Sequence, residues 1–226
     1  MKKRRYITKI LVFILVLGIS FVNIGSFDVE AAANNKEEKK AKKVVTAYMH
    51  NAKVYNPDKM KKYFIKKPKY AYAKYFVKLF RGKNKKYLTY KIKSVAIKNK
   101  KGIIKVKVTQ PDYYVAFLLG TDNYLCWFSD YYDIHDKYPA TKTAGKKYRK
   151  YIKKSVKAHG MDTVTRTVKF KMKKTKKGWK IVKGTKSIRD IASAQLNRAT
   201  DDAYWCFEND ENIYDYIDDY EEEYGD

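Results

Sequence analysis

The densest group of reactive side chains in this sequence is the run Asp130-Tyr131-Tyr132-Asp133-Ile134-His135-Asp136. On a helix, residues three apart share a face, so Asp133 would lie beside Asp130 and again beside Asp136. Paired carboxylates of this kind would bind a hard metal ion or act as an acid and a base. The spacing matches no metal-binding loop, and a solvated helix end explains the same residues. Asp130, Asp133, His135 and Asp136 are the candidate polar site, and the structural explanation is favoured.

The rest of the chain carries no motif for catalysis. His50, His135 and His159 are isolated in sequence and lack a ligand spacing such as His-Glu-x-x-His. A glycine-rich phosphate loop and a Gly-x-Ser-x-Gly elbow are both absent. We therefore expect no catalytic residue, no metal ligand and no cofactor.

Four aromatic residues precede or interrupt the acidic run: Trp127, Phe128, Tyr131 and Tyr132. They would line a ligand cavity if the fold encloses one. Aromatic residues at helical spacing are more often plain core, so both interpretations stay open.

Residues 1–33 have the order of a secretory signal peptide. Lys2 to Arg5 are basic, an apolar run extends from Ile10 to Ile19, and the segment ends in Val-Glu-Ala-Ala-Ala. Small residues allow cleavage after Ala31 or Ala33. An uncleaved anchor is the alternative, although its apolar core is short of the roughly 20 residues that a span needs. No cysteine lies near the cleavage region, so we predict a secreted or cell-envelope protein without a lipid anchor.

The only cysteines are Cys126 and Cys206. Export permits a disulfide between them. Their positions in one sequence do not show whether they meet, so a bond and two separate thiols are both open.

Charge is divided very unevenly along the chain. Residues 1–200 hold all 51 Lys and Arg and 12 of the 24 acidic residues, whereas residues 201–226 hold the other 12 acids and no Lys or Arg. Only seven of the basic residues are Arg. Lysine is a hydrated point charge, while Arg makes the bidentate contacts of selective recognition. This composition favours non-specific attraction to polyanions, and the alternative is codon bias in an AT-rich genome.

Hydrophobic periodicity predicts an α+β fold. Helical spacing appears near residues 41–52, 57–64, 68–82, 112–135, 148–159 and 187–196. Alternation of apolar residues with Lys or Thr predicts two hairpins, at 88–110 with a bend near Ser94 and at 164–182. The expected architecture is N-terminal helices packed on a curved antiparallel sheet, with a helical insert between the two hairpins.

Three regions follow from these patterns: a signal peptide at 1–33, a basic α+β domain at 34–200, and an acidic, Tyr-rich C-terminal tail at 201–226. The tail is expected to dock on the basic body, of the same chain or of a neighbouring one, with Trp205, Phe207 and Ile217 supplying apolar contact. A solvated, mobile tail is the alternative.

Three stretches resemble exported cone-shaped domains related to nuclear transport factor 2, the cystatin-like or lumazine-binding-like group. They are AKKVVTAYMHNAKVYNPDKMKKYF, YLTYKIKSVAIKNKKGIIKVKVTQPD and the closing DTVTRTVKFKMKKTKKGWKIV. The resemblance covers about residues 36–200 and implies a cone fold around a cavity. Some such domains are enzymes with an Asp/His or Tyr/Asp pair in the cavity, but neither pair can be placed on matching positions here. Many exported members are lipoproteins, and this chain departs from them in lacking the lipid-modified cysteine.

The sequence therefore predicts an exported, non-catalytic binding module of a Gram-positive-type bacterium. Its expected partners are anionic cell-wall polymers or other polyanions, or a small ligand, together with its own acidic tail. The alternatives are an extracellular nucleic-acid-binding protein, which the scarcity of Arg disfavours, and a cone-fold enzyme with an acidic site near Asp130–Asp136.

Overall fold

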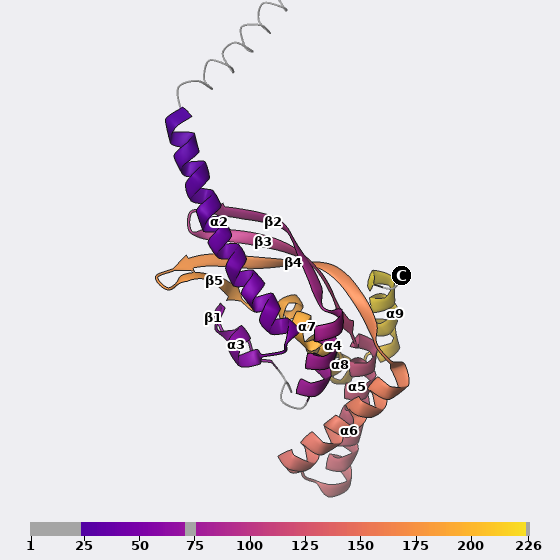
Figure 1. Ribbon diagram of the computed structural model, residues 1–226. Helices are drawn as coiled ribbons and strands as arrows, with labels where there is room; N and C mark the ends of the chain where they lie inside the picture. The colour runs from indigo at the N-terminus through magenta and orange to yellow at the C-terminus, as the bar shows by residue number, and fades with distance from the viewer. Residues whose placement is uncertain (1–23, 71–75, 225–226) are drawn as a thin grey trace, which may run out of the picture. The chain divides into compact units, whose positions relative to one another are not determined.

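The computed structural model describes residues 24–70 and 76–224 of the chain (Figure 1). The chain divides into two compact units, Met1–Lys40 and Ala41–Asp226. The described part of the first unit is the beginning of helix α2 (Ile24–Lys53), where Lys40 pairs with Glu37 at 3.1 Å. Most of the expected signal peptide, residues 1–23, lies outside the described residues. Among the described helices, none combines the length and apolar character needed to cross a bilayer.

The second unit contains a mixed five-stranded sheet in the order β1-β5-β4-β3-β2. The strands are β1 (Phe64–Lys66), β2 (Thr89–Lys98), β3 (Lys101–Asp112), β4 (Asp162–Thr175) and β5 (Gly178–Lys183). The two predicted hairpins are β2–β3 and β4–β5, and β3 joins them through a continuous antiparallel ladder with β4. Only the short β1 runs parallel to its neighbour, β5.

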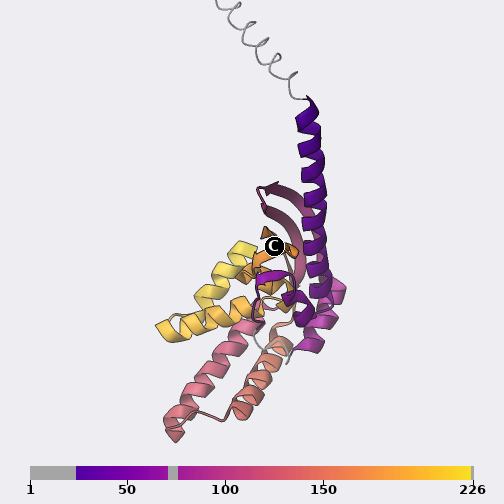
Figure 2. The same cartoon turned by 90° about the vertical axis from the view of Figure 1, so that its left-hand side faces the viewer.

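Alternation in the strands separates a buried face from an exposed one. Ile104, Val106 and Val108 of β3 are fully buried, and the lysines between them are exposed. The ladder of β2 shifts register between Ile92 and Ser94, which confirms the predicted bend. Figure 2 shows the resulting curvature of β2 and β3.

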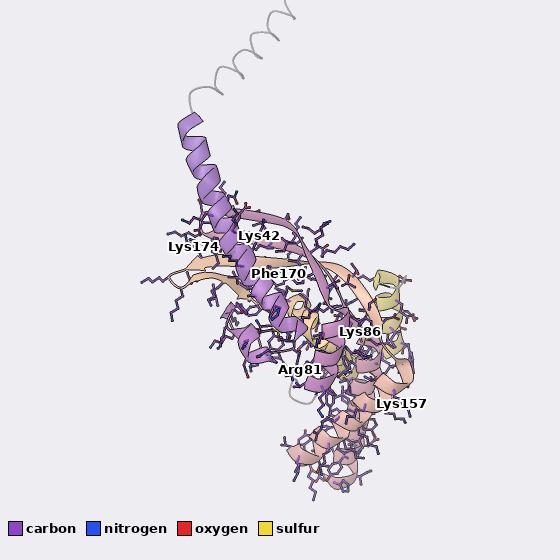
Figure 3. The ribbon with its side chains drawn as sticks, in the orientation of Figure 1. Lys42, Arg81, Lys86, Lys157, Phe170 and Lys174 are labelled. Carbon is purple, nitrogen blue, oxygen red and sulfur yellow. The ribbon has the colours of Figure 1, made fainter. Side chains whose placement is uncertain are left out.

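The buried face of the sheet is covered by α2, α4 (Val77–Tyr87) and α7 (Lys186–Ser193). Helix α5 (Tyr114–His135) begins beside α4, where Phe117 contacts Phe80 at a centroid distance of 6.2 Å. The Tyr48 ring of α2 packs edge-on against Phe170 of β4 at 5.7 Å, where α2 crosses the sheet in Figure 3. The buried Asn84 amide donates to the carbonyls of Ala52 and Ala192, and so ties α4 to both α2 and α7. These interactions fix the N-terminal helices on the sheet, as the sequence predicted.

The helical insert between the hairpins is α5 paired with α6 (Thr141–His159), and it extends away from the sheet (Figure 2). At Gly120 a Cβ atom would meet Ile152 and Ser155 at 3.0–3.1 Å, so the two helices approach too closely for a larger residue. Helix α6 ends at Gly160 with φ +76°, as predicted for a helix-terminating glycine.

The C-terminal region forms two helices that pack on the rest of the domain. Helix α8 (Leu196–Asn209) runs across the predicted boundary at residue 200, and α9 (Ile213–Tyr224) follows it. Ile217 is buried in the core, as the docking hypothesis required. Trp205 and Phe207 are 53% and 43% exposed, so about half of each side chain remains accessible to solvent. Further apolar contact comes from Ala203, Cys206, Ile213 and Tyr220.

Two local predictions also need correction. Helix α3 (Pro57–Lys61) begins as predicted, with the Asn56 side chain accepting from Lys59 N, but it ends early because Phe64 enters β1. The helix expected at 68–82 is present only as α4, which begins at Val77; residues 68–70 are not helical, and residues 71–75 lie outside the described residues. Gly82 lies inside α4 and does not end it, because no close contact or positive φ angle demands a break there.

Candidate functional site

The predicted polar site lies on the exposed C-terminal end of α5. Asp130, Asp133, His135 and Asp136 are all exposed, and the His135 ring contacts Tyr131 with a centroid distance of 4.3 Å. Asp136 takes a left-handed conformation (φ 48°) that ends the helix. Within the described ranges, no group of three or more His, Cys, Asp or Glu residues could hold a metal ion. The run therefore has the environment of a solvated helix end.

The four candidate cavity residues form an aromatic cluster on the α5–α6 pair. Phe128 and Tyr132 contact Tyr138 at centroid distances of 5.6 and 4.8 Å. Trp127 contacts Tyr131 at 5.7 Å, and the Lys147 ammonium lies 5.0 Å from the Trp127 ring centroid. These aromatic residues pack on one another and are half-buried or exposed.

The two cysteines are free thiols. Cys126 is exposed on α5, whereas Cys206 is buried on α8. Desolvation raises the pKa of both thiols, which makes them poor nucleophiles at neutral pH.

A pocket of about 420 Å³ lies where α5 begins and α9 ends. Its buried carboxylate, Asp112, uses both oxygens: Oδ1 accepts from Tyr114 N at 2.8 Å, and Oδ2 accepts from the Tyr220 hydroxyl at 2.6 Å. Burial raises the pKa of Asp112, and the facing Asp162 adds to the rise. Both oxygens of Asp112 are therefore engaged within the protein, and its hydrogen bond to Tyr220 holds α9 in place.

Next to this pocket, a second carboxylate is fully buried at the junction of α7 and α8. Asp190 Oδ1 accepts from the backbone N–H groups of Asn197 and Arg198, at 3.1 and 3.3 Å, and from the Asn197 amide. The carboxylate therefore caps the first turn of α8, where backbone donors have no helical partner. Burial raises the pKa of Asp190, and the charge of Arg166 partly offsets the rise.

Three arginines of this region, Arg166, Arg189 and Arg198, form ion pairs or hydrogen bonds with α7, α8 and α9. Arg198 pairs with Asp202 and Glu223 and lies 4.9 Å from the Tyr220 ring centroid. Arg189 pairs with Asp201, and Arg166 donates to the Ser187 carbonyl. Arg166 thus joins β4 to α7, while Arg189 and Arg198 join α7, α8 and α9 to one another. The exposed face of the sheet carries lysine instead.

The exposed side of the sheet is the strongest candidate for binding. We define the lysine face as eight exposed lysines of β2, β3 and β4: Lys91, Lys98, Lys101, Lys105, Lys107, Lys169, Lys171 and Lys173. Four pairs of them are directly opposite in the ladders: Lys91–Lys107, Lys98–Lys101, Lys101–Lys173 and Lys105–Lys169. Like charges in this position destabilise a sheet, so the arrangement has a cost in the isolated chain.

Strands β2, β3 and β4 carry no acidic residue on the side that presents the lysine face. The only acids in β2–β5 are Asp112 and Asp162, which face each other at the far end of the β3–β4 ladder. Among the described residues, none of the eight lysines takes part in an ion pair. Neighbouring strands lie about 4.8 Å apart, and alternate residues on a strand are about 7 Å apart. The lysine face is therefore a dense grid of ammonium groups, able to contact several anionic groups of a polymer at once.

No protein-family model matches the chain, and no curated protein or solved structure is significantly similar to it. The resemblance to the cone-shaped domains stays a prediction.

Sequence reasoning anticipated the lysine face from alternation but missed the buried network. A signal for the network was present: Gln110 and Arg166 occupy inward positions of β3 and β4 among apolar residues. Polar residues at inward positions of a strand require buried partners.

Proposed function

We propose that this protein binds anionic cell-wall polymers outside the cytoplasm, through its lysine face and without catalysis. The single observation that supports the proposal is the set of four directly opposed lysine pairs on an exposed sheet face that carries no acid. An anionic polymer would relieve the repulsion between these lysines. Location outside the cytoplasm is inferred from the signal-like order of residues 1–33.

Binding by this surface depends on charge and not on selective hydrogen bonding. Lysine side chains bind phosphate as point charges, without the planar fork of Arg. Counterion release then dominates the affinity, which falls steeply as salt rises. We therefore expect similar affinities for phosphate-bearing wall polymers that differ in their backbone. Any binding to nucleic acid should depend little on the nucleotide sequence.

The test is binding to purified wall polymer as a function of salt concentration. A variant with Lys91, Lys105, Lys107 and Lys169 all changed to Gln should lose about tenfold or more in affinity at about 0.15 M salt, with a shallower salt dependence. The matched control changes four exposed lysines of α6 to Gln: Lys142, Lys150, Lys153 and Lys157. It removes the same charge elsewhere, so an equal loss in both variants would show that net charge alone acts and would reject the lysine face as the site.

Nucleic acid is a second ligand in the same experiment. Wild-type protein that prefers duplex DNA over wall polymer at equal phosphate concentration would replace the wall-polymer proposal with the nucleic-acid alternative.

A further inference from the structure

The exposed sides of α8 and α9 carry many acidic residues, whereas the exposed face of the sheet carries lysines. Seven exposed acids of this region form neither an ion pair nor a side-chain hydrogen bond with any residue that the structure describes: Glu208, Asp210, Glu211, Asp218, Asp219, Glu221 and Glu222. The whole chain carries 51 basic residues, and none of them lies beyond residue 200. These acids are thus unpaired within a basic protein.

Large aromatic side chains are exposed among these acids. Trp205 and Phe207 are about half exposed, and Tyr214 is 62% exposed. Trp and Tyr carry much of the binding energy at protein interfaces, where aromatic residues are enriched. We define the acidic–aromatic surface as the exposed sides of α8 and α9 that carry these three aromatics and the seven acids.

The acidic–aromatic surface is fixed away from the lysine face of its own chain. Tyr220 stacks on Tyr114 at 3.8 Å and donates to Asp112, while Ile213 and Ile217 are buried in the core. The ion pairs that acids of α8 and α9 do form go to Lys186, Arg189 and Arg198. To meet the lysine face, α8 and α9 would have to leave the core, so only a second molecule can bring the two surfaces together.

We propose that the acidic–aromatic surface binds the lysine face of a second copy of this chain, so that copies associate head to tail. The proposal rests on the proposed function in one respect, because both assign binding to the lysine face. The two surfaces are different, so the contact is heterologous and each copy keeps one free surface of each kind. Wall polymer and a second copy then compete for the same lysines.

The net charge of +27 does not prevent this contact at physiological salt. Repulsion between whole molecules is screened beyond about 8 Å at 0.15 M, so the local arrangement of opposite charges decides the interaction. At 1 M salt the screening length falls to about 3 Å, and the association should be lost.

The test is sedimentation of the purified full chain, without polymer, at about 0.15 M and 1 M salt. The acid variant carries Asp218→Asn, Asp219→Asn, Glu221→Gln and Glu222→Gln, and the lysine variant is the quadruple Gln variant defined above. Each alone should associate at least tenfold more weakly than wild type at the lower salt, while an equimolar mixture should form one-to-one pairs. A mixture is decisive because each variant keeps the surface that the other has lost.

A matched control carries Asp130→Asn, Asp133→Asn and Asp136→Asn, which neutralises exposed acids at the end of α5. It should associate as the wild type does. Wild-type association of the acid variant, or a mixture that stays monomeric, overturns the proposal. Polymer binding measured on the same proteins separates the two proposals. If the wild type stays monomeric while the lysine variant loses affinity for wall polymer, only the head-to-tail contact is refuted.

Discussion

The two faces of the β3–β4 pair differ in what their polar residues contact. On the outer face, Lys105 lies directly across from Lys169, and neither forms an ion pair with a described residue. On the inner face, the Gln110 amide donates to the Asp190 carbonyl at 3.1 Å, and Arg166 donates to the Ser187 carbonyl. The outer residues repel one another, whereas the inner residues join the sheet to α7.

This difference separates residues that serve the fold from residues that serve a partner. Buried polar groups are retained when hydrogen bonds satisfy them, and removal of one member leaves the others unpaired. Exposed like charges in register contribute no such stabilisation. We therefore expect substitutions on the inner side to change stability and substitutions on the outer side to change binding.

The largest effect is expected for Asp190→Ala. The substitution removes the cap of α8, worth about 1 kcal/mol, and leaves buried donors of Asn197 unsatisfied, at about 1–3 kcal/mol. The free energy of unfolding, measured by urea denaturation, should fall by about 3 kcal/mol. Asp130→Ala at the exposed end of α5 is the control and should change it by less than about 0.5 kcal/mol. Equal values for the two variants would show that the Asp190 network does not hold the C-terminal helices.

The secondary structure could be predicted largely from periodicity. Strands β3 and β4 alternate over most of their length between apolar residues and Lys or Thr, and this pattern also predicts which lysines are exposed. Helices α5 and α6 follow from their apolar spacing and from Gly160. The lysine face was therefore accessible from the sequence, because it depends only on alternation and on the pairing of adjacent strands.

The C-terminal helices could not be placed from the sequence, because their docking depends on distant residues. Tyr220 bonds to Asp112, which is 108 positions earlier in the chain. The short β1 pairs with β5, which follows more than a hundred residues later. Charge and composition suggested a removable tail, yet a truncation after Thr200 would delete the buried Ile213, Ile217 and Tyr220. Substitution of single residues is for this reason a better test of the region than truncation.

A smaller effect should appear in the pH dependence of stability. Burial raises the pKa of Asp190 above its ordinary value of 3.8. The folded chain therefore binds this proton more tightly than the unfolded chain, so the stabilisation is fully present below pH 3.8 and is lost as pH rises through the raised pKa.

Asp190→Asn removes this titration while it keeps one oxygen for the cap. The free energy of unfolding of the wild type relative to this variant should therefore increase as pH falls from 7 towards 4. A difference that stays constant, or that shrinks on acidification, would contradict a raised pKa at this position.

The smallest effect, and the only gain, is expected on the outer face. Lys105→Gln with Lys169→Gln removes one directly opposed pair from the middle of the β3–β4 ladder. Loss of the repulsion should raise the free energy of unfolding by about 0.5 kcal/mol at low salt, and the gain should vanish near 1 M salt because exposed charges are screened there. Lys142→Gln with Lys157→Gln on α6 removes equal charge without an opposed partner and should give no such gain. The same Lys105 and Lys169 substitutions should weaken binding to wall polymer, so stability and binding move in opposite directions. If stability fell instead, these lysines would be stabilising the sheet, and the distinction between its two faces would fail.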